Sequence, residues 1–493
     1  MRSRAVGQSG SRAVDSDERC ANSRVAYWPE PTARLSALAG TLLLAVAVFW
    51  PCLRYGFAMD DFALIEAGRA PLAVGIPAHF VPQPGVHYRP LGQYGYFWLA
   101  DRLLPYAPLP YHLANLALHL LTVLLVWWLA RRFVADVIAV ALATLFFAIH
   151  SGYFLVLSWV ALAGEITPAL CCLAALACWL VYWTPGTRRR PLWWLLTCLC
   201  VVLALLTKQV AVALPPALLL YQALFQPAAG WPRRGPLRVA PAALLLQAPL
   251  ALYAWFVLRV SGSHASGPYH LVFGLDAVRT GLTYILWVGD LPRLADDYPP
   301  LALAGAALGV VALLAYAGRR RDRVLLFGLG WFALFLAPVV FLPEHMFHYY
   351  LYLPGLGAAL VLARLAEIML RGLRRNTRLV LALTGAVLLV LCNVVGVVYE
   401  LGHNPTMVQE AEGRRALATL RADHPQLPPG ATIEFVAPAD HIYYVLGYGA
   451  AVRLAYPGVP VRVVFDDILV PASSGTGPTY RYRWNGETIV ALP

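Results

Sequence analysis

Apolar residues occur along this chain in long blocks separated by short polar segments. Many of the blocks approach the length of about 20 residues that crosses a membrane as a helix. The blocks do not show the alternation expected of strands. We therefore predict a polytopic α-helical membrane protein with about eleven transmembrane helices, at residues 35–53, 109–130, 134–148, 166–183, 192–206, 210–224, 239–258, 301–317, 324–342, 351–370 and 379–401.

Arginine distinguishes the two sets of connections between these helices. Every second connection carries two or more arginines, as at Arg131-Arg132 and 188–190, whereas the short turns on the other side carry none. Cytoplasmic connections are enriched in Lys and Arg. We therefore expect an integral inner-membrane protein with a cytoplasmic N-terminus and an extracytoplasmic C-terminus. Residues 1–34 are polar and arginine-rich, which predicts a disordered cytoplasmic tail.

Two long outer segments interrupt the transmembrane domain of residues 35–401. The first, at 54–108, contains many prolines, so its helices should be short. Within it, residues 61–69 have the apolar side of a helix that lies in the membrane interface. The second outer segment, at 260–300, includes an amphipathic stretch over 271–288 that is compatible with the same location.

Residues 402–493 have the pattern of a small extracytoplasmic α/β domain. We predict one helix over 405–421 and another across 441–456. Short runs rich in β-branched and aromatic residues predict strands. These strands lie at 431–436, 461–465, 480–484 and 488–492.

Composition agrees with a membrane protein and bears on the choice of partner. Of the 493 residues, 60% are hydrophobic and only 13% are charged, and the mean hydropathy is +0.62. A net charge of +12 is compatible with nucleic acid binding. However, the arginines lie in connections between apolar helices, which makes the charge a signal of orientation. We therefore predict no nucleic acid partner.

The most notable polar feature is the acidic pair Asp60-Asp61, directly after the first apolar block. One reading is an N-terminal cap, because helix dipoles favour carboxylates at this end. Capping needs only one acid, however, and polar groups at membrane depth are usually functional. The second reading is a general base that faces a cavity at the membrane surface.

Lys208 is the only lysine among 38 basic side chains. The helices on either side of Thr207-Lys208-Gln209 are short, so this turn should lie below the outer surface and be shielded by protein. Lysine is a compact charge that suits a phosphate, although a lysine at a helix end can also reach the interface without binding a ligand. Arg89 offers the same choice beside His87 and Tyr88, between phosphate binding and an interfacial position on an aromatic belt.

Several further polar residues lie within or at the ends of apolar blocks. They face either a cavity or another helix through hydrogen bonds: His112, Asn115, His119, His150 and Glu165. His345 and His348 have a spacing that suits a metal, but no third ligand is near, so we predict no metal site there. The chain has no glycine-rich nucleotide-binding loop of the usual patterns.

These motifs resemble those of the GT-C superfamily, polytopic glycosyltransferases that use polyprenyl-phosphate-linked sugars. The pattern is most similar to transmembrane O-mannosyltransferases with TPR repeats and to their bacterial relatives. The similar stretches are Asp60-Asp61, Tyr88-Arg89-Pro90-Leu91, Tyr111-His112-Leu113-Ala114-Asn115 with His119, Phe146-Phe147-Ala148-Ile149-His150, Thr207-Lys208-Gln209 and Tyr350-Leu351-Tyr352-Leu353-Pro354.

The likeness covers residues 35–370 and has clear departures. The TPR array is missing, and an α/β domain takes its place. Substitutions fall within the similar stretches: Ser151, Tyr153 and Leu155 replace that family's Pro, His and Glu, Gln209 replaces a Glu, and His348-Tyr349 replace a Glu-Arg pair.

The resemblance implies an inverting membrane glycosyltransferase with its site on the outer face and a hexose or mannose as the sugar. Asp60 or Asp61 would accept the proton of an acceptor hydroxyl on a protein or glycan; the family pattern assigns this role to the first acid. The residues expected around the lipid-linked donor are Tyr88, Arg89, Lys208, His345 and His348, with His87, His112, Asn115, His150 and Glu165 elsewhere in the cavity.

This scheme requires no soluble cofactor, although a divalent cation bound by the two acids remains open. A transporter or flippase of lipid-linked sugars is the alternative function. It predicts inverted repeats and charges near the membrane midplane, and the sequence shows neither. A purely structural membrane protein would leave the polar residues on the outer side unexplained.

Overall fold

A computed structural model describes residues 31–82, 87–226, 246–260, 269–289, 298–466, 468 and 477–493. Three predicted features lie wholly or partly outside these residues. They are the N-terminal tail, the inner connection that carries Arg233, Arg234 and Arg238, and residues 261–268 and 290–297 of the outer segment 260–300.

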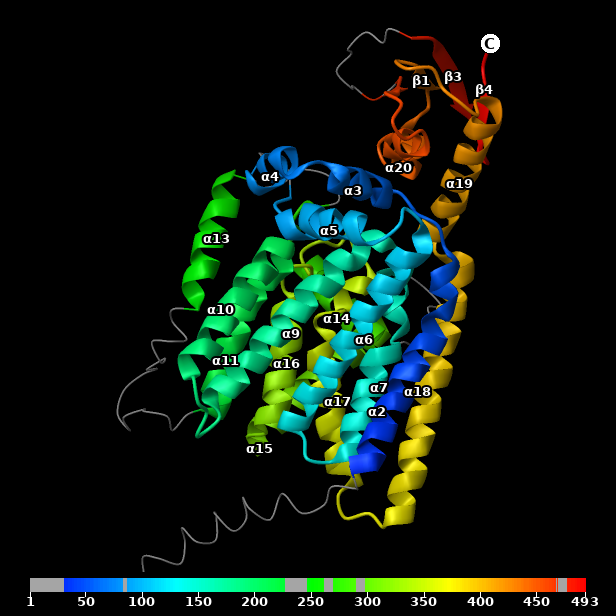
Figure 1. The fold of residues 1–493 in the computed structure, drawn as a ribbon. Coiled ribbons are helices and arrows are strands. Elements are labelled where there is room, and N and C mark those ends of the chain that lie inside the picture. Colours follow the sequence, from blue (N-terminus) through cyan, green and yellow to red (C-terminus); the bar gives the residue numbers. More distant parts are fainter. Residues whose placement is uncertain are drawn as a thin grey trace, which may run out of the picture.

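A bundle of long helices forms the main body of the protein (Figure 1). Each predicted transmembrane segment contains a helix, and the described part of 239–258 begins at 246. The helices are α2 (Pro31–Phe49), α6 (Pro108–Phe133), α7 (Val137–Ile149), α9 (Ala163–Trp183), α10 (Arg190–Thr207), α11 (Leu214–Phe225), α13 (Gln247–Val260), α15 (Pro300–Arg320), α16 (Arg323–Leu336), α17 (Gly355–Leu370) and α18 (Arg375–His403).

Seven helical segments in the described part of the chain are long and apolar enough to cross a membrane, and two shorter apolar ones accompany them. The chain is therefore an integral membrane protein. Small residues bring some of these helices close together: a Cβ atom at Gly357 of α17 would lie 2.4 Å from the carbonyl oxygen of Gly328 in α16. Packing of this kind is typical of membrane helices.

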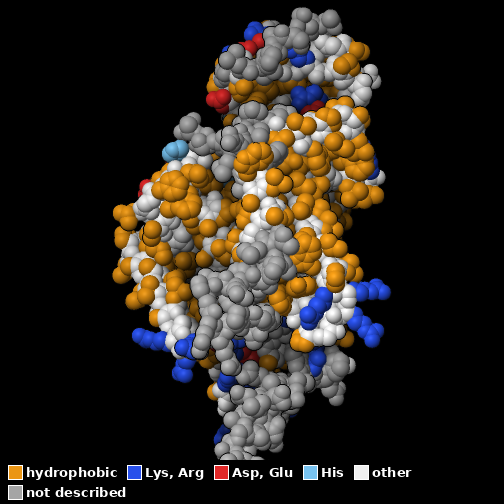
Figure 2. All heavy atoms as spheres, turned by 90° about the vertical axis from the view of Figure 1, so that its left-hand side faces the viewer, with side chains coloured by type: hydrophobic (Ala, Val, Ile, Leu, Met, Phe, Trp, Pro, Cys, Tyr) orange, Lys and Arg blue, Asp and Glu red, His pale blue; other side chains and the backbone are white. Residues whose placement is uncertain are grey.

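The two ends of the bundle differ in charge. The α6–α7 and α17–α18 connections lie at the end away from the C-terminal residues (Figure 1), and they adjoin Arg131, Arg132, Arg371 and Arg374. Figure 2 shows a mostly hydrophobic flank with Lys and Arg side chains gathered near its lower end. We call this end the arginine end and the opposite end the domain end.

Short helices cover the domain end of the bundle. They are α3 (Asp60–Arg69), α4 (Leu72–Phe80), the π-helix η3 (Pro90–Gly95) and α5 (Tyr96–Leu103). In Figure 1, α3, α4 and α5 lie across the helix ends, at the same end of the bundle as the C-terminal part of the chain. Short helices were predicted for this proline-rich segment, and the prediction is confirmed. In the second outer segment, α14 (Leu275–Val288) forms within the amphipathic stretch 271–288.

The C-terminal domain follows α18 through α19 (Pro405–Asp423), which extends beyond the bundle (Figure 1). Its sheet has the order β2-β1-β3-β4. The central strand β1 (Thr432–Val436) pairs in parallel with β2 (Arg462–Phe465) and β3 (Thr479–Trp484), whereas β4 (Ile489–Ala491) is antiparallel to β3. All four predicted strands are confirmed, with ends that differ by at most one residue.

The single helix predicted across 441–456 is wrong. The structure has two short helices, α20 (Asp440–Val445) and α21 (Ala450–Ala455). The turn between them contains Gly447, Tyr448 and Gly449, all with positive φ angles of 53°, 60° and 84°. Three left-handed residues in succession end an α-helix, because right-handed helical residues have negative φ angles.

The core of the C-terminal domain is continuous with the segment that covers the bundle. One cluster of buried residues includes Phe62 and Ile65 of α3, Phe97 of α5, and Ile442 and Leu446 from the C-terminal domain. The domain therefore packs directly on α3. The predicted fold class, a polytopic helical membrane protein with a small C-terminal α/β domain, is confirmed.

Candidate functional site

Asp61 is fully buried at the start of α3, and its carboxylate is used in local structure. Its Oδ2 accepts a hydrogen bond from the Ala58 amide at 2.9 Å, and its Oδ1 accepts one from the Ala161 amide at 2.6 Å. Burial, with a smaller contribution from the charge of Asp60, raises the pKa of Asp61 to about 8, although the amide hydrogen bonds lower it. Asp61 therefore joins α3 to the turn that precedes α9.

Asp60 has a different environment. It is partly exposed, and its Oδ1 accepts a hydrogen bond from the Tyr448 hydroxyl at 2.9 Å. Burial raises the pKa of Asp60, while the Tyr448 hydrogen bond and the charge of Arg89 lower it. Of the two acids, Asp60 is the one with a carboxylate that a reactant can reach.

Arg89 directly precedes the π-helix η3, which lies against the C-terminal end of α10. The Arg89 Nε donates to Gln209 Oε1 at 2.6 Å. The approach depends on a residue without a side chain, because a Cβ atom at Gly92 would lie 2.5 Å from the carbonyl oxygen of Thr207. This contact places Arg89 next to the turn that carries Lys208.

Lys208 forms a buried ion pair with Glu165 from the first turn of α9. The side chains of the two residues are only 11% and 5% exposed. The Lys208 Nζ also lies 5.1 Å from the ring centroid of Tyr350 and 5.7 Å from that of Tyr349. The structure therefore places Glu165 against Lys208, so the positive charge of Lys208 is locally compensated.

His345 lies on the same side, in a group of rings. The Tyr269 ring is 4.4 Å from the His345 ring and 4.6 Å from the His87 ring. Burial and the positive charges of Lys208 and Arg89 lower the pKa of His345 to about 4, so its imidazole is neutral at neutral pH. Tyr269 was not predicted from the sequence, because no local pattern marks its contact with residues so far away in the chain.

His348 and Tyr88, which were also expected to bind the donor, make other contacts. The His348 ring stacks on Trp287 at 3.7 Å and lines a cavity of about 380 Å³ that also includes Tyr399 and His403. The Tyr88 hydroxyl donates to the Phe80 carbonyl oxygen at 3.3 Å. His345 and His348 are therefore directed into different surroundings, although they are three residues apart.

The polar residues predicted within the helices connect backbone segments. The two ring nitrogens of His112 lie 3.1 Å and 3.2 Å from the carbonyl oxygens of Leu157 and Tyr55. Asn115 accepts a hydrogen bond from Tyr96 and donates one to Val160. The Nδ1 of His150 accepts a hydrogen bond from the Gly152 amide, and its Nε2 lies 3.3 Å from the Val288 carbonyl oxygen. These contacts favour the interpretation that the three residues stabilise the bundle.

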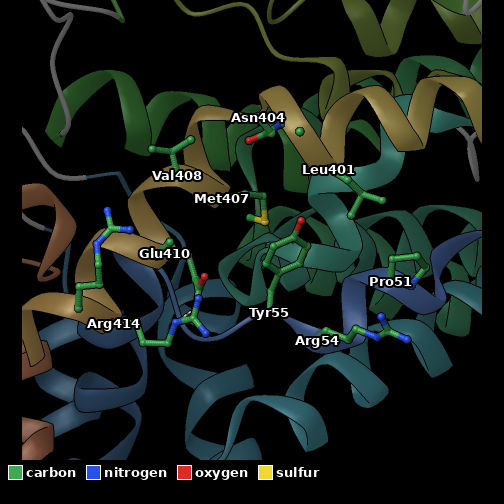
Figure 3. A pocket seen from close by; sticks show the side chains of 12 residues that line it. Pro51, Arg54, Tyr55, Leu401, Asn404, Met407, Val408, Glu410 and Arg414 are labelled. Carbon is green, nitrogen blue, oxygen red and sulfur yellow. Dashed lines mark ion pairs between the residues drawn. The ribbon is translucent and has the colours of Figure 1, made fainter. Parts of the chain in front are cut away.

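A larger cavity, of about 670 Å³, lies where η2 (Trp50–Arg54) meets the junction of α18 and α19. Figure 3 shows Tyr55 and Met407 near its centre, with Arg54 and Arg414 on opposite sides. Glu410 lines it and accepts a hydrogen bond from the Gly56 amide. This cavity contains none of the predicted site residues, so the candidate site rests on the contacts of Asp60 and Arg89.

The described residues include no group of three or more His, Cys, Asp or Glu side chains that could hold a metal ion. The residues that do come together on the domain end have a clear chemical character. One reachable carboxylate, Asp60, lies within electrostatic range of Arg89, which in turn influences His345 and Lys208. This arrangement suits a reaction that removes a proton at one point while negative charge develops near the cations.

No family model and no curated protein matches the sequence. Solved structures do resemble the fold. The oligosaccharyltransferase of Archaeoglobus fulgidus, tethered with an acceptor peptide, matches with a TM-score of 0.50 and 15% identity over 88% of this chain and 64% of that chain. ArnT from Cupriavidus metallidurans bound to undecaprenyl phosphate matches with a TM-score of 0.46 and 17% identity, over 88% of this chain and 90% of that chain.

The chain spans less than two thirds of the length of the oligosaccharyltransferase. At such low identity the likeness concerns the fold. The shared fold is the helical membrane bundle, which in this chain is followed by a small C-terminal sheet domain.

Proposed function

We propose that this protein is an inverting membrane glycosyltransferase that moves a sugar, a hexose such as mannose, from a polyprenyl-phosphate donor to an acceptor hydroxyl. The observation that carries the proposal is the unequal placement of the acidic pair. Both carboxylate oxygens of Asp61 accept hydrogen bonds from backbone amides, whereas Asp60 is partly exposed and within electrostatic range of Arg89. The fold shared with an oligosaccharyltransferase supports the same reaction class.

In the proposed reaction, Asp60 accepts the proton of the acceptor hydroxyl as the hydroxyl oxygen attacks the anomeric carbon of the donor sugar. The bond between that carbon and the phosphate oxygen breaks, and the electron pair leaves with the polyprenyl phosphate. Arg89 stabilises the charge of the departing phosphate. Lys208 contributes a second cation when the phosphate competes with Glu165 for its ammonium group.

The proposal includes an orientation for the molecule in the membrane. The arginine end is cytoplasmic and the domain end is extracytoplasmic, as cytoplasmic enrichment of arginine indicates. Residues 35–401 form the transmembrane domain, and residues 402–493 form the outer domain. The donor's polyprenyl chain then lies among apolar helices while its phosphate meets Arg89 at the domain end.

The acceptor is a protein or a glycan. The matching oligosaccharyltransferase structure holds an acceptor peptide, which makes a protein acceptor the first to test. The reaction as written needs no soluble cofactor. Another structure of that oligosaccharyltransferase contains Zn and sulfate, so metal dependence is tested by adding a chelator to the assay.

Donor turnover by the purified protein in proteoliposomes tests the proposal. Polyprenyl-phosphate hexose is supplied, and the release of polyprenyl phosphate is measured with and without acceptor peptides and glycans. A nucleotide sugar serves as the control donor. We expect release from the lipid-linked donor only; use of the nucleotide sugar alone, or transport of the lipid-linked donor without its cleavage, would contradict the proposal.

A further inference from the structure

The C-terminal domain places one tyrosine directly on the candidate base. Tyr448 lies in the turn between α20 and α21, and its hydroxyl donates to Asp60 Oδ1 at 2.9 Å although the two residues are 388 positions apart. No other hydrogen bond to the Asp60 carboxylate occurs among the described residues. One oxygen of Asp60 is thus held, and the other is left to accept the hydrogen of a reactant.

The backbone on both sides of this contact has unusual conformations. Tyr448 has a φ of 60°, and Met59, just before Asp60, has a φ of 42°. Positive φ is uncommon for residues other than glycine, and such strain is maintained only where the surrounding structure enforces it. Gly447 also has a positive φ, and it has no room for a side chain, because a Cβ atom there would lie 2.4 Å from the Met59 carbonyl oxygen.

A bidentate ion pair fixes the same two elements together. Arg453 of α21 donates from Nε and an Nη to the two carboxylate oxygens of Glu66 in α3, at 2.6 Å and 2.7 Å. Bidentate arginine–carboxylate pairs constrain orientation as well as distance. With the shared apolar core at Phe62 and Leu446, this pair sets the position of the turn above Asp60.

We propose that Tyr448 is a positioning residue for Asp60, and that the C-terminal domain completes the candidate active site by docking on α3 through Arg453 and Glu66. This inference rests on the proposed glycosyl transfer for its kinetic consequence. The docking itself follows from the contacts between the two elements and does not depend on the reaction.

The hydroxyl of Tyr448 acts on Asp60 in two ways. It orients the carboxylate so that Oδ2 faces away from the bond, and it stabilises the ionised form that a base requires. Burial and the charge of Asp60 raise the pKa of Tyr448, so its proton stays in place as a donor. In the described part of the chain, the other titratable or charged groups that influence Asp60 or respond to it are Asp61, Arg89 and Tyr269.

The sign of the pH effect follows from this hydrogen bond. Because the bond lowers the pKa of Asp60, Tyr448→Phe raises it. Asp60 must be ionised to accept a proton, so the loss of kcat/KM in the variant should be greatest at low pH and should shrink as the pH rises. At low pH we expect a loss of roughly tenfold, the scale of one hydrogen bond to a charged group.

The test compares pH profiles of kcat/KM for the full-length wild type, Tyr448→Phe and Tyr444→Phe in the proteoliposome assay. Tyr444 belongs to the same domain and is 53% exposed, and it serves as the matched control that retains the bond to Asp60. We expect an upward shift of the acidic limb for Tyr448→Phe alone. An unchanged profile for Tyr448→Phe would overturn the positioning role, and a loss that is equal at every pH would overturn the stabilisation of ionised Asp60 by Tyr448.

Docking has its own readout. Arg453→Gln should speed hydrogen exchange of the α3 amides, and the reversed pair Glu66→Arg with Arg453→Glu should slow it again. Unchanged exchange in Arg453→Gln would overturn the docking step. If the wild type transfers no sugar, the proposed function fails, while the exchange result still decides whether the domain is fixed on α3 by this ion pair.

Discussion

Asp60 and Asp61 are adjacent in the chain but have separate tasks in the structure. Successive residues of a helix point about 100° apart, which predicts that the two acids differ. The sequence alone could not say which one is buried, because that depends on Ala161, one hundred residues away. The same reason explains why Tyr448 and Tyr269 were not predicted: their contacts join distant segments.

Lys208 is a second residue whose type alone predicted a special role without identifying its partner. A single lysine in an arginine-rich chain indicated a special role, and the structure gives it a buried partner, Glu165. A buried ion pair is weak evidence for stability, but removing one partner leaves an unpaired charge. The ion pair has a structural role if it only stabilises the fold, and a role in binding if Lys208 also contacts the donor phosphate. One double variant separates these two roles.

Replacing Lys208 by Met should destabilise the protein by about 3–5 kcal/mol, because Glu165 is left buried and unpaired. Adding Glu165→Gln should restore most of the thermal unfolding midpoint in detergent. If Lys208 also contacts the donor phosphate, the double variant folds but shows a raised KM for the donor. A Lys208→Met protein as stable as the wild type would contradict the buried pair, and a normal donor KM in the double variant would remove Lys208 from the donor site.

At the scale of elements, the transmembrane helices were predictable from hydropathy because backbone groups in a bilayer must be hydrogen-bonded within the helix. The elements outside the transmembrane bundle were less predictable from the sequence. The helix expected across 441–456 is divided by the turn at Gly447-Tyr448-Gly449. The two glycines were visible in the sequence, but the need for them comes from tertiary contacts: Gly447 lies against Met59 and Phe62 at the start of α3, and Gly449 lies against Val463 of β2.

The contact between η3 and α10 determines where Arg89 lies. Gly92→Ala places a Cβ atom in conflict with the Thr207 carbonyl oxygen, and overpacking of this kind costs about 1–3 kcal/mol. We expect η3 to shift and Arg89 to move from Gln209, which raises the KM for the donor more than it lowers kcat. Steady-state kinetics with varied donor concentration measure this split.

Gly95→Ala is the matched control in the same π-helix. Its nearest neighbour would be the Leu91 Cδ2 at 3.1 Å, the end of a flexible side chain. This variant should keep a donor KM near that of the wild type. Equal effects of the two substitutions would show that the position of η3 on α10 does not control donor binding.

At the scale of the whole molecule, the arginine end and the domain end are at opposite ends of the bundle (Figure 1). The alternation of arginines predicted this separation, and the proposed orientation follows from it. The function of the C-terminal domain could not be predicted from its sequence, since its strands and helices show only a small α/β unit. Its contacts with Glu66 and Asp60 reveal how it relates to the site.

Accessibility labelling tests the orientation. In a background without the native cysteines, Asp440→Cys in the C-terminal domain should react with an impermeant maleimide added to intact cells. Arg321→Cys, in the connection between α15 and α16, should react only after the membrane is opened. Both positions are exposed in the structure. Labelling in the opposite order would place the site on the cytoplasmic side.

The most direct test of the central claim is the rate of sugar transfer from a polyprenyl-phosphate donor by Asp60→Asn, compared with the wild type and Asp61→Asn. The amide keeps the shape of Asp60 but cannot accept the proton, so we expect a loss of roughly 10²–10⁴ in rate with donor binding retained. Asp61→Asn should keep more activity and mainly lower the stability of the fold, because Asp61 accepts hydrogen bonds from two backbone amides. Wild-type transfer by Asp60→Asn would contradict the account; loss of transfer in Asp61→Asn alone would assign the base to Asp61.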